Sequence, residues 1–405
     1  MEYVELTDIK IGGGKIEYTY TAPARLRKYL RQNNTLYVEY PEDCDLRTLP
    51  TSVLTIPFVS CFLSVTMLLK IGVKVNELDR DYYESIPRIR AAYKRMFPYL
   101  DLCFDVIAKT TYENRYESAK RPSLFFTGGL DATSALVEKA DEHPLLVNIW
   151  GGDISTADNA SHKELEDYLN RVSHDMNTDY VFIKSNCREL FNEQKVTRLL
   201  ATKILPWQNH GWWASIAHIL SMSALMAPLA YIFRIGHHYV ASSYDAKSKT
   251  FDANNQTLLD AIKFSSCNLV PVDSDLERSG KARKIIKFCN ENDMRFELKV
   301  CWYRQGGKNC SHCEKCYRTI MEICSNHGDP NLFGFTVTDK TFLEMQAYLK
   351  SNYVNKGYWN PIRKNFRKEA NYWKGKPEFA WILDMNFNRP KAIINKAIYV
   401  INKFI

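Results

Sequence analysis

Hydrophobic and polar residues alternate in two different ways in the first third of this chain. A period of two in Lys15–Tyr20 and in Thr35–Tyr40 predicts strands. Residues 53–71 are almost all apolar, which predicts a buried helix, and Arg80–Met96 has the pattern of an amphipathic helix. We therefore expect residues 1–118 to form a smaller α+β accessory domain of their own.

Short apolar runs and helical patterns then alternate from about residue 119 to residue 335. Strands are predicted at Leu124–Phe126, Leu145–Ile149, Asp179–Lys184 and Ala230–Ile235. Helices are predicted after the first strand through about Ala140 and at residues 161–176, 213–226 and 279–290. This order predicts an α/β fold with a parallel sheet covered by helices on both faces. Ligands of such sheets bind at the carboxyl ends of the strands.

The uncharged stretch of residues 211–233 is long enough to cross a membrane. Pro228 interrupts it, however, and serines and a histidine are scattered along it, so we interpret it as a buried helix followed by a core strand. The N-terminal residues have no basic region followed by an apolar one, so we expect no secretory signal. A cytoplasmic protein is predicted.

The sequence TGGLDAT joins the first strand of this region to its helix. Adjacent glycines let the backbone approach a ligand closely, and the N–H groups at a helix start favour an anion. An aspartate would repel phosphate unless it helps to hold a Mg²⁺ ion that bridges the phosphates. We therefore predict a nucleotide-phosphate site. Its candidate residues are Thr127, Gly128, Gly129, Leu130, Asp131, Ala132 and Thr133.

Four of the eleven cysteines are clustered, at Cys301, Cys310, Cys313 and Cys316. Their spacing, C-x8-C-x2-C-x2-C, suits a closed tetrahedral Zn²⁺ site, although an iron–sulfur cluster could use the same ligands. Without an export signal, the odd number of cysteines indicates reduced thiols and a metal site rather than disulfides. We predict a structural zinc ion, because four thiolates leave no open position for chemistry.

The two motifs together resemble those of the PP-loop ATP pyrophosphatase superfamily, and most of all those of the 7-cyano-7-deazaguanine synthase family. The loop is similar to the family's SGGxDS, with Thr127 and Ala132 in place of its serines. The family also has a cysteine, then CGxCxxC, then a nearby arginine; here Ser311 stands in place of the glycine and Arg318 follows the cluster. The resemblance covers residues 121–325.

This resemblance implies a Rossmann-like domain of the adenine nucleotide alpha hydrolase type over residues 119–335. It also implies that the protein binds ATP with Mg²⁺, activates a carboxyl or carbonyl oxygen as an adenylate, and releases pyrophosphate. The backbone near Asn148 and Trp150 would hold the adenine. The substrate would be a small carboxylated molecule, and ammonia or an amine would attack the adenylate.

Three residues are candidates for direct roles in catalysis: Asp131, Lys281 and His237. Lys281 lies in the first turns of a predicted helix, where acids are more usual, so an anionic ligand nearby would explain it; a solvated charged face is the alternative. His237 follows the predicted fourth strand and so would lie at the ligand-binding edge. The alternative for the pair His237 and His238 is that one packs and the other forms a hydrogen bond.

Residues 336–405 are expected to form a basic helical tail. Residues 351–405 hold eleven Lys and Arg against three Asp and Glu, a net +8 that equals the charge of the whole chain. Aromatic residues are interleaved with these charges, and residues 391–405 have the pattern of a basic amphipathic helix. Such a helix could bind an anionic membrane surface or an acidic protein partner, or it could pack on its own domain.

We therefore expect an ATP-dependent ligase that forms AMP and pyrophosphate and acts on a deazaguanine, or in an anti-phage or polysaccharide pathway. One alternative is a PP-loop tRNA sulfur transferase that holds RNA on the basic aromatic tail. Another is a nucleotide-binding scaffold without turnover, suggested by Ala132. A homodimer is compatible with any of these functions.

Overall fold

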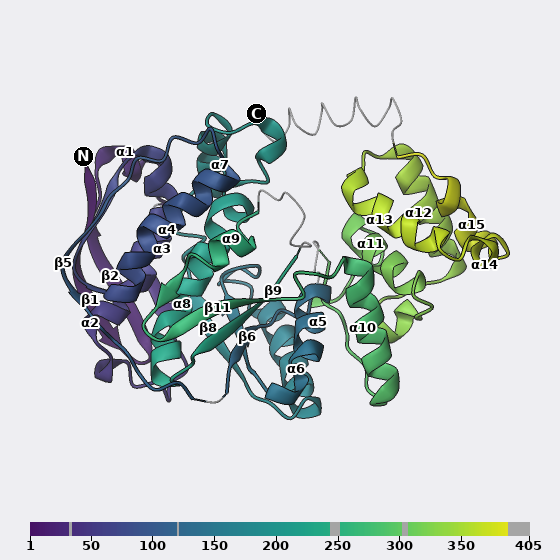
Figure 1. The fold of residues 1–405 in the computed structure, drawn as a ribbon, viewed down its shortest axis with the longest axis horizontal. Helices are drawn as coiled ribbons and strands as arrows, with labels where there is room; N and C mark the ends of the chain where they lie inside the picture. The colour runs from purple at the N-terminus through teal and green to yellow at the C-terminus, as the bar shows by residue number, and fades with distance from the viewer. Residues whose placement is uncertain (32–34, 120, 244–251, 302–306, 388–405) are drawn as a thin grey trace. The chain divides into compact units, whose positions relative to one another are not determined.

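The computed structural model describes residues 1–31, 35–119, 121–243, 252–301 and 307–387. The chain divides into two compact units, each built from separate stretches of sequence (Figure 1). The first contains residues 1–125, 139–159 and 176–274, and the second contains residues 126–138, 160–175 and those from 275 onward. All of the described strands lie in the first unit, whereas the second unit is helical.

The first unit is organised on one sheet of eleven strands in the order β10-β11-β9-β6-β7-β8-β3-β2-β1-β4-β5. The strands are β1 (Tyr3–Gly12), β2 (Lys15–Thr21), β3 (Leu36–Glu39), β4 (Gly72–Asp79), β5 (Val106–Tyr112), β6 (Ser123–Phe125), β7 (Leu145–Trp150), β8 (Tyr180–Ser185), β9 (His237–Ala241), β10 (Lys263–Phe264) and β11 (Cys267–Val272). The neighbours from β11 to β8 all pair in parallel. The predicted α/β class with a mostly parallel sheet is therefore confirmed.

The N-terminal strands continue this same sheet. β3 pairs antiparallel with β8, at Val38 opposite Ser185, and β2, β1, β4 and β5 extend the sheet outward from there. The first compact unit therefore continues past residue 118, where the sequence predicted a domain boundary. Within this region, the predicted helix Arg80–Met96 is confirmed as α4. Asp79 caps this helix by accepting a 2.9 Å hydrogen bond from the Tyr82 N–H.

Further helices of the first unit are α1 (Ala24–Arg27), α2 (Thr51–Leu54), α3 (Ile56–Leu69), α7 (Glu193–Ala201), α8 (His218–Ile232) and α9 (Gln256–Leu259). The second unit contains α5 (Leu130–Glu138), α6 (Asn159–Asp175), α10 (Arg278–Glu291), α11 (Glu314–Cys324), α12 (Asp339–Ser351), α13 (Lys356–Arg367), α14 (Ala370–Lys374) and α15 (Pro377–Asp384). The predicted helix at residues 161–176 thus begins two residues earlier than expected, at Asn159.

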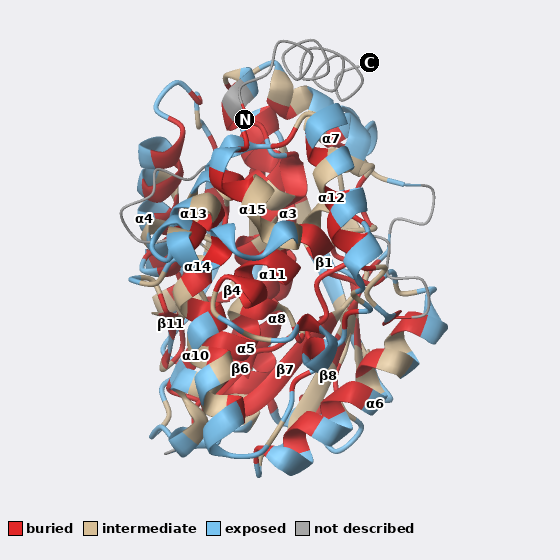
Figure 2. Ribbon diagram, turned by 90° about the vertical axis from the view of Figure 1, so that its right-hand side faces the viewer, coloured by how far each residue is buried: buried red, intermediate tan, exposed pale blue. Residues whose placement is uncertain are grey.

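Two apolar helices form the core of the first unit. The stretches Thr51–Leu69 and Trp213–Ile232 are long and apolar enough to cross a membrane, but 100% and 83% of their most apolar windows are buried inside the protein. α3 and α8 pack against each other, and the Ser60 hydroxyl donates a 2.5 Å hydrogen bond to the Leu220 carbonyl between them. Figure 2 shows the same burial in the strands β6 and β7. Both helices have the burial of core helices.

The predicted strand at Ala230–Ile235 is wrong. The helix that begins with a π-helical turn at Trp213 continues as α8 through Ile232, with Pro228 inside it, and the next strand, β9, begins at His237. An apolar run that is buried on all sides has no periodicity to separate a helix from a strand. Pro228, which suggested a break, is accommodated inside α8. This error moves the histidine pair from the end of a strand to the start of one.

The last described helices form a folded part of the second unit. Trp359, Phe366 and Trp373 are at most 3% exposed, and the rings of Phe366 and Trp373 lie 4.8 Å apart between centroids. α12 to α15, the yellow-green helices of Figure 1, pack on one another through contacts of α15 with the other three and of α13 with α14. The interleaved aromatic residues are therefore a hydrophobic core. Residues 388–405, which include the predicted amphipathic helix, lie outside the described residues.

Candidate functional site

The predicted phosphate loop follows β6, which ends at Phe125, and leads into α5, which begins at Leu130. Gly128 has a φ of +72°, and a Cβ atom there would lie 2.6 Å from the Tyr168 ring. The Gly128 carbonyl accepts a 2.7 Å hydrogen bond from the Lys299 N–H. Gly128 is therefore required by the backbone and by the packing of the loop.

Gly129 differs from its neighbour. Its φ is not in the left-handed region, and a Cβ atom there would meet nothing closer than 3.6 Å. The Gly129 carbonyl accepts a 2.9 Å hydrogen bond from the Thr133 N–H, which starts the helix. The protein itself therefore does not need a glycine here. The small residue leaves the partly exposed edge of the loop open to an anion, beside the N–H groups of the first turn of α5.

Asp131 is held by two cations from the first turn of α10. Its Oδ2 lies 2.7 Å from Arg278 Nη1, and its Oδ1 lies 3.0 Å from Lys281 Nζ. Burial alone would raise the pKa of the Asp131 carboxyl, but the charges of Arg278 and Lys281 lower it below its usual value. The structure thus brings the predicted residues Asp131 and Lys281 together.

The other basic residues of α10 point elsewhere. Arg283 donates a 3.0 Å hydrogen bond to Asn326, and Lys284 pairs with Glu138 at 2.8 Å. Sequence reasoning missed Arg278, because the helix was predicted to begin one residue later, at Ser279. The signal was present in the sequence, since residues 278 and 281 are three apart and therefore share one face of a helix.

Two loop residues face the interior. Thr133 is fully buried, and its hydroxyl lies beside the Tyr168 phenol; Ala132 is 7% exposed. The Thr133 hydroxyl therefore lies inside the second unit, and the part of Thr133 in the phosphate site stays a prediction. Thr127 is partly exposed at the start of the loop. It remains the candidate hydroxyl donor.

Lys299 fixes the inner side of the loop. Its ammonium lies 2.8 Å from Glu164 and 5.2 Å from the centre of the Tyr168 ring, and the residue is 6% exposed. Its side chain would also meet a Cβ atom on Gly128, at 3.1 Å. Lys299 thus links the loop to α6 and to the segment that leads to the cysteine cluster. Sequence reasoning did not single it out.

Asn148 and Trp150, the predicted adenine-binding positions, belong to the first unit. β7 pairs with β6 as far as Val147 and with β8 as far as Trp150, so its last residues extend beyond β6. The Trp150 indole donates a 2.9 Å hydrogen bond to the Ser155 carbonyl, and the Lys184 ammonium lies 4.1 Å from its ring centre. Their predicted location at the carboxyl end of β7 is correct, and the adenine contact stays a prediction.

His237 and His238 lie at the opposite edge of the sheet. His238 is opposite Ser123, the first residue of β6, in a parallel pair, so both histidines are at the amino ends of the strands. His238 is fully buried, 2.7 Å from the Ser123 hydroxyl, and burial lowers its pKa to about 3. His237 is exposed. The strand-end argument for His237 is therefore wrong, and the packed, hydrogen-bonded alternative describes His238.

The four clustered cysteines converge as predicted. Their sulfur atoms all lie within 4.8 Å of one another, and two pairs, Cys301 with Cys313 and Cys310 with Cys316, are 3.9 Å apart. Four thiolates at a Zn–S distance of about 2.3 Å around a tetrahedral ion would be about 3.8 Å apart. The donor set and its geometry therefore fit a metal ion such as zinc.

The turn between Cys310 and Cys313 contains a residue with left-handed backbone angles. Ser311, which stands in place of a glycine, has a φ of +59°, in the left-handed region that favours glycine. Its hydroxyl accepts a 2.9 Å hydrogen bond from the Thr336 N–H. A side-chain hydrogen bond with Cys313 that favours the protonated thiol, together with burial, raises the pKa of Cys316. A bound cation would offset this by stabilising the thiolates.

Comparison with protein-family models, with curated proteins and with solved structures gives no match. No family is therefore assigned by similarity of the whole chain or of its fold. The functional argument rests on the loop, on the cations around Asp131 and on the four cysteines.

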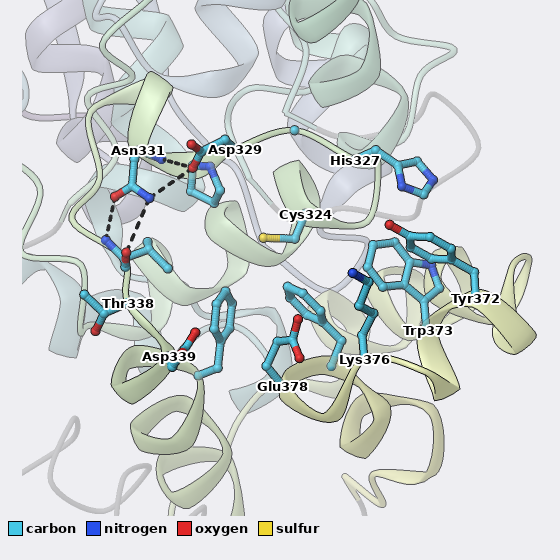
Figure 3. Close-up of a pocket in the computed structure, with 15 residues that line it drawn as sticks. Cys324, His327, Asp329, Asn331, Thr338, Asp339, Tyr372, Trp373, Lys376 and Glu378 are labelled. Atoms are coloured by element: carbon cyan, nitrogen blue, oxygen red, sulfur yellow. Dashed lines mark hydrogen bonds between the residues drawn. The ribbon is translucent and has the colours of Figure 1, made fainter.

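A cavity of about 370 Å³ lies among the C-terminal helices of the second unit (Figure 3). Its walls include Phe342, Tyr372, Trp373 and Phe379, with the polar side chains Asp329, Asn331, Asp339, Lys376 and Glu378 around them. His327 stacks on Trp373 with ring centres 5.2 Å apart. None of the residues predicted from the sequence as site residues lines this cavity. Its aromatic walls lie in residues 336–405, for which the sequence predicted a basic tail.

Proposed function

We propose that the protein is an ATP-dependent ligase of the PP-loop type, similar to 7-cyano-7-deazaguanine synthase, which forms AMP and pyrophosphate. The observation that carries the proposal is the ion cluster at the loop. Asp131 follows a Gly-Gly turn at the start of α5 and is bonded to two cations, Arg278 and Lys281, from the start of α10. Asp131 carries one negative charge against the two positive charges of Arg278 and Lys281, so the helix start keeps a net positive charge that favours an anion.

In this proposal, the loop edge at Thr127 and Gly129 binds the phosphates of ATP, and Lys281 and Arg278 turn from Asp131 to the phosphate oxygens. The freed Asp131 carboxylate helps to hold the Mg²⁺ ion, which neutralises phosphate charge. An oxygen of the carboxylated substrate attacks the α-phosphorus, and pyrophosphate leaves. The protein contributes position and charge stabilisation, and supplies no covalent group. The Rossmann-like, adenine nucleotide alpha hydrolase type of fold is part of the same proposal.

The cysteine cluster supports this function without taking part in the chemistry. Four thiolates saturate a zinc ion, so it has no open position for a substrate. Cys313 caps α11, since its sulfur accepts a 3.5 Å hydrogen bond from the Cys316 N–H. The metal would therefore hold the start of α11 in place within the second unit.

Sulfur transfer is a weaker alternative. It needs an accessible, reactive thiol near the ligand-binding ends of the strands; Cys187, two residues after β8, has such a place in the sequence but is only 2% exposed. A hydrogen bond to Cys187 and burial both raise the pKa of Cys61, the thiol beside it. Trp359 and Trp373 are also buried, so they cannot stack on RNA bases. The scaffold alternative rests on Ala132, which is 7% exposed, and observed turnover of ATP would exclude it.

Incubation of the full chain with ATP, Mg²⁺, ammonium and a set of carboxylated deazaguanines tests the proposal. AMP and pyrophosphate are the expected products, and their formation should require one of the carboxylates. The loop lacks the lysine of a Walker A motif, which supports cleavage between the α- and β-phosphates. ADP and phosphate as the products would overturn the assignment.

Partners and location are further parts of the proposal. Residues 391–405 lie outside the described residues, so their binding to an anionic membrane surface or an acidic protein partner rests on the sequence alone. The apolar face predicted for this helix favours either of these over nucleic acid. We accordingly propose a cytoplasmic protein that binds peripherally to such a surface.

A further inference from the structure

The cavity among the C-terminal helices has no role in the proposed ligase function. Its volume of about 370 Å³ falls in the range of small-molecule sites. Residues from the end of α11, from a 3-10 turn (Pro330–Phe333) and from α12, α14 and α15 line it (Figure 3). A hollow of this size, walled by several separate elements of one compact unit, is suited to a small ligand.

Aromatic rings form much of the wall. Phe379 lies edge-on to two other lining rings, with centres 4.7 Å from that of Phe342 and 5.2 Å from that of Trp373. Tyr372 also lines the cavity. Aromatic faces pack on methylene groups and attract organic cations, because the ring quadrupole is negative on its faces. The walls therefore favour an apolar chain that carries positive charge.

The charged side chains around the cavity are mostly acidic. Three carboxylates line it, those of Asp329, Asp339 and Glu378, against the single ammonium of Lys376, which gives a net charge of −2 with His327 neutral. Among the described residues, neither these three carboxylates nor Lys376 forms an ion pair. Like charges that gather without a counterion repel one another, so a cation that enters the cavity is stabilised by all three carboxylates.

The carboxylates are spread around the cavity. In Figure 3, Asp329 lies on one side of the open space, and Asp339 and Glu378 lie on the other. Asp329 accepts hydrogen bonds from Asn331 on Oδ1 only, at 2.9 Å from the N–H and 3.0 Å from the side-chain amide, so Oδ2 is available to a ligand. Two ammonium groups at the ends of one molecule would therefore each meet a carboxylate.

The inner wall confirms that these charges act on the cavity. Cys324, at the end of α11, lines the cavity and is 5% exposed. Burial raises the pKa of its thiol, and the charges of Asp329 and Glu378 raise it further. The thiol is therefore neutral, and the carboxylates supply the negative charge of the site.

We propose that this cavity binds an aliphatic diamine. The methylene chain lies among the aromatic rings, and the two ammonium groups lie at the carboxylates on opposite sides. A dication balances the net charge of −2, which neither a neutral ligand nor an anion does. The inference is independent of the proposed ligase function, since it uses none of the residues proposed to bind ATP.

Calorimetric titration of the full chain with putrescine, in an amine-free buffer, tests the ligand class. One site per chain is expected. Butanediol has the same chain length without charge and should bind at least about tenfold more weakly, and butylamine, with one charge, should lie between them. No heat of binding with putrescine at up to about 10 mM, or equal binding of butanediol, would overturn the proposal.

Variants of the lining residues test the location. Glu378→Gln and Asp339→Asn should each weaken putrescine binding by about tenfold. Glu344→Gln is the matched control, because Glu344 lies on α12 with Asp339 but pairs with Lys340 at 3.4 Å and does not line the cavity. Phe379→Leu keeps an apolar wall without a ring and should weaken binding by a few-fold.

Thermal unfolding without putrescine shows which of these variants are folded, and any one folded lining variant decides the location. Unchanged affinity in that variant, or an equal loss in the control, would overturn the site. Such a result would leave the ligase proposal unaffected, because release of pyrophosphate is measured separately.

Discussion

Arg278 and Asp131 are 147 residues apart in sequence, yet Arg278 Nη1 lies 2.7 Å from Asp131 Oδ2. Lys281 Nζ lies 3.0 Å from the other carboxylate oxygen, so both oxygens of Asp131 are paired with a cation. An anion that enters the loop must compete with Asp131 for these cations. The cluster is therefore the place where loss of a single charge should affect nucleotide chemistry most.

Lys281→Met should abolish most ATP cleavage, by about 10²-fold or more, because it removes a buried charge proposed to meet the phosphates. Arg283→Met removes the same charge from the same helix, but Arg283 bonds to Asn326 and not to Asp131. It should leave turnover near the wild-type level. Pyrophosphate release measured on both variants is the comparison, and equal losses would show that helix stability, and not the site, explains the effect.

The two loop glycines should respond differently to alanine. Gly128→Ala places a side chain at a φ of +72° and 2.6 Å from the Tyr168 ring, so it should destabilise the fold by about 1–3 kcal/mol. Gly129→Ala meets no close atom and should leave the unfolding temperature nearly unchanged while it weakens nucleotide binding. Thermal unfolding with and without Mg·ATP measures both effects. Unchanged ATP stabilisation in Gly129→Ala would argue against close approach of phosphate to this residue.

Protein purified without added metal should contain close to one zinc ion per chain. Cys313→Ser removes a ligand and the cap of α11, so it should lower the unfolding temperature, because the free energy of metal binding is part of the free energy of folding. Ser311→Gly, in the same turn, is the comparison that keeps all four ligands, and it should keep the metal. Elemental analysis decides the matter, and the visible absorbance of an iron–sulfur cluster would contradict the zinc assignment.

The stability of the chain should depend on pH through Glu322, which is buried on α11. Burial raises its pKa in the folded state from a usual value of 4.5 to about 7, so the stability it contributes is complete below its usual pKa and is lost as the pH rises through about 7. Between these values the wild type should lose on the order of 3 kcal/mol that Glu322→Gln does not lose. Denaturant unfolding over this range measures the difference. Asp131, whose pKa is lowered, acts in the opposite sense, with stability lost only in acid.

Truncation after Pro390 tests the predicted amphipathic helix. The shortened protein should keep ATP turnover and lose binding to anionic vesicles at low salt, since each Lys near such a surface contributes about 1 kcal/mol. Vesicle co-sedimentation at low and high salt provides the measurement. If the shortened chain unfolds and the full chain ignores vesicles, residues 391–405 are part of the core.

Where the sequence carries a local pattern, the structure agrees with it. Strands β6, β7 and β8 lie within a residue of their predicted bounds, and α4 has its predicted bounds, because apolar runs and a capping aspartate mark them. Ala230–Ile235 was misassigned because burial on every side removes periodicity. Burial was also missed in the last described helices. Their aromatic residues between lysines form a hydrophobic core, whereas the sequence suggested a surface on which RNA bases could stack.

The candidate site likewise contains some residues that a local sequence pattern predicts and others that only the tertiary structure reveals. The cysteine spacing and the glycine loop are local, so they could be found from the sequence. The pairing of Arg278 with Asp131 across 147 residues and the burial of the Glu322 carboxylate depend on tertiary contacts, which no local pattern reveals. His237 shows the reverse case, since one wrongly placed strand moved it to the other end of the sheet.

The second unit is built from residues 126–138, 160–175 and those from 275 onward. During synthesis on a ribosome, the glycine loop and α6 therefore emerge long before the helices and cysteines that complete their surroundings. The Asp131 carboxylate gains its two cationic partners only after α10 has been made. Metal capture and assembly of this unit must consequently wait until the chain has been made past Cys316. A nascent chain stalled before residue 275 would carry the phosphate loop with none of the residues proposed to make it work.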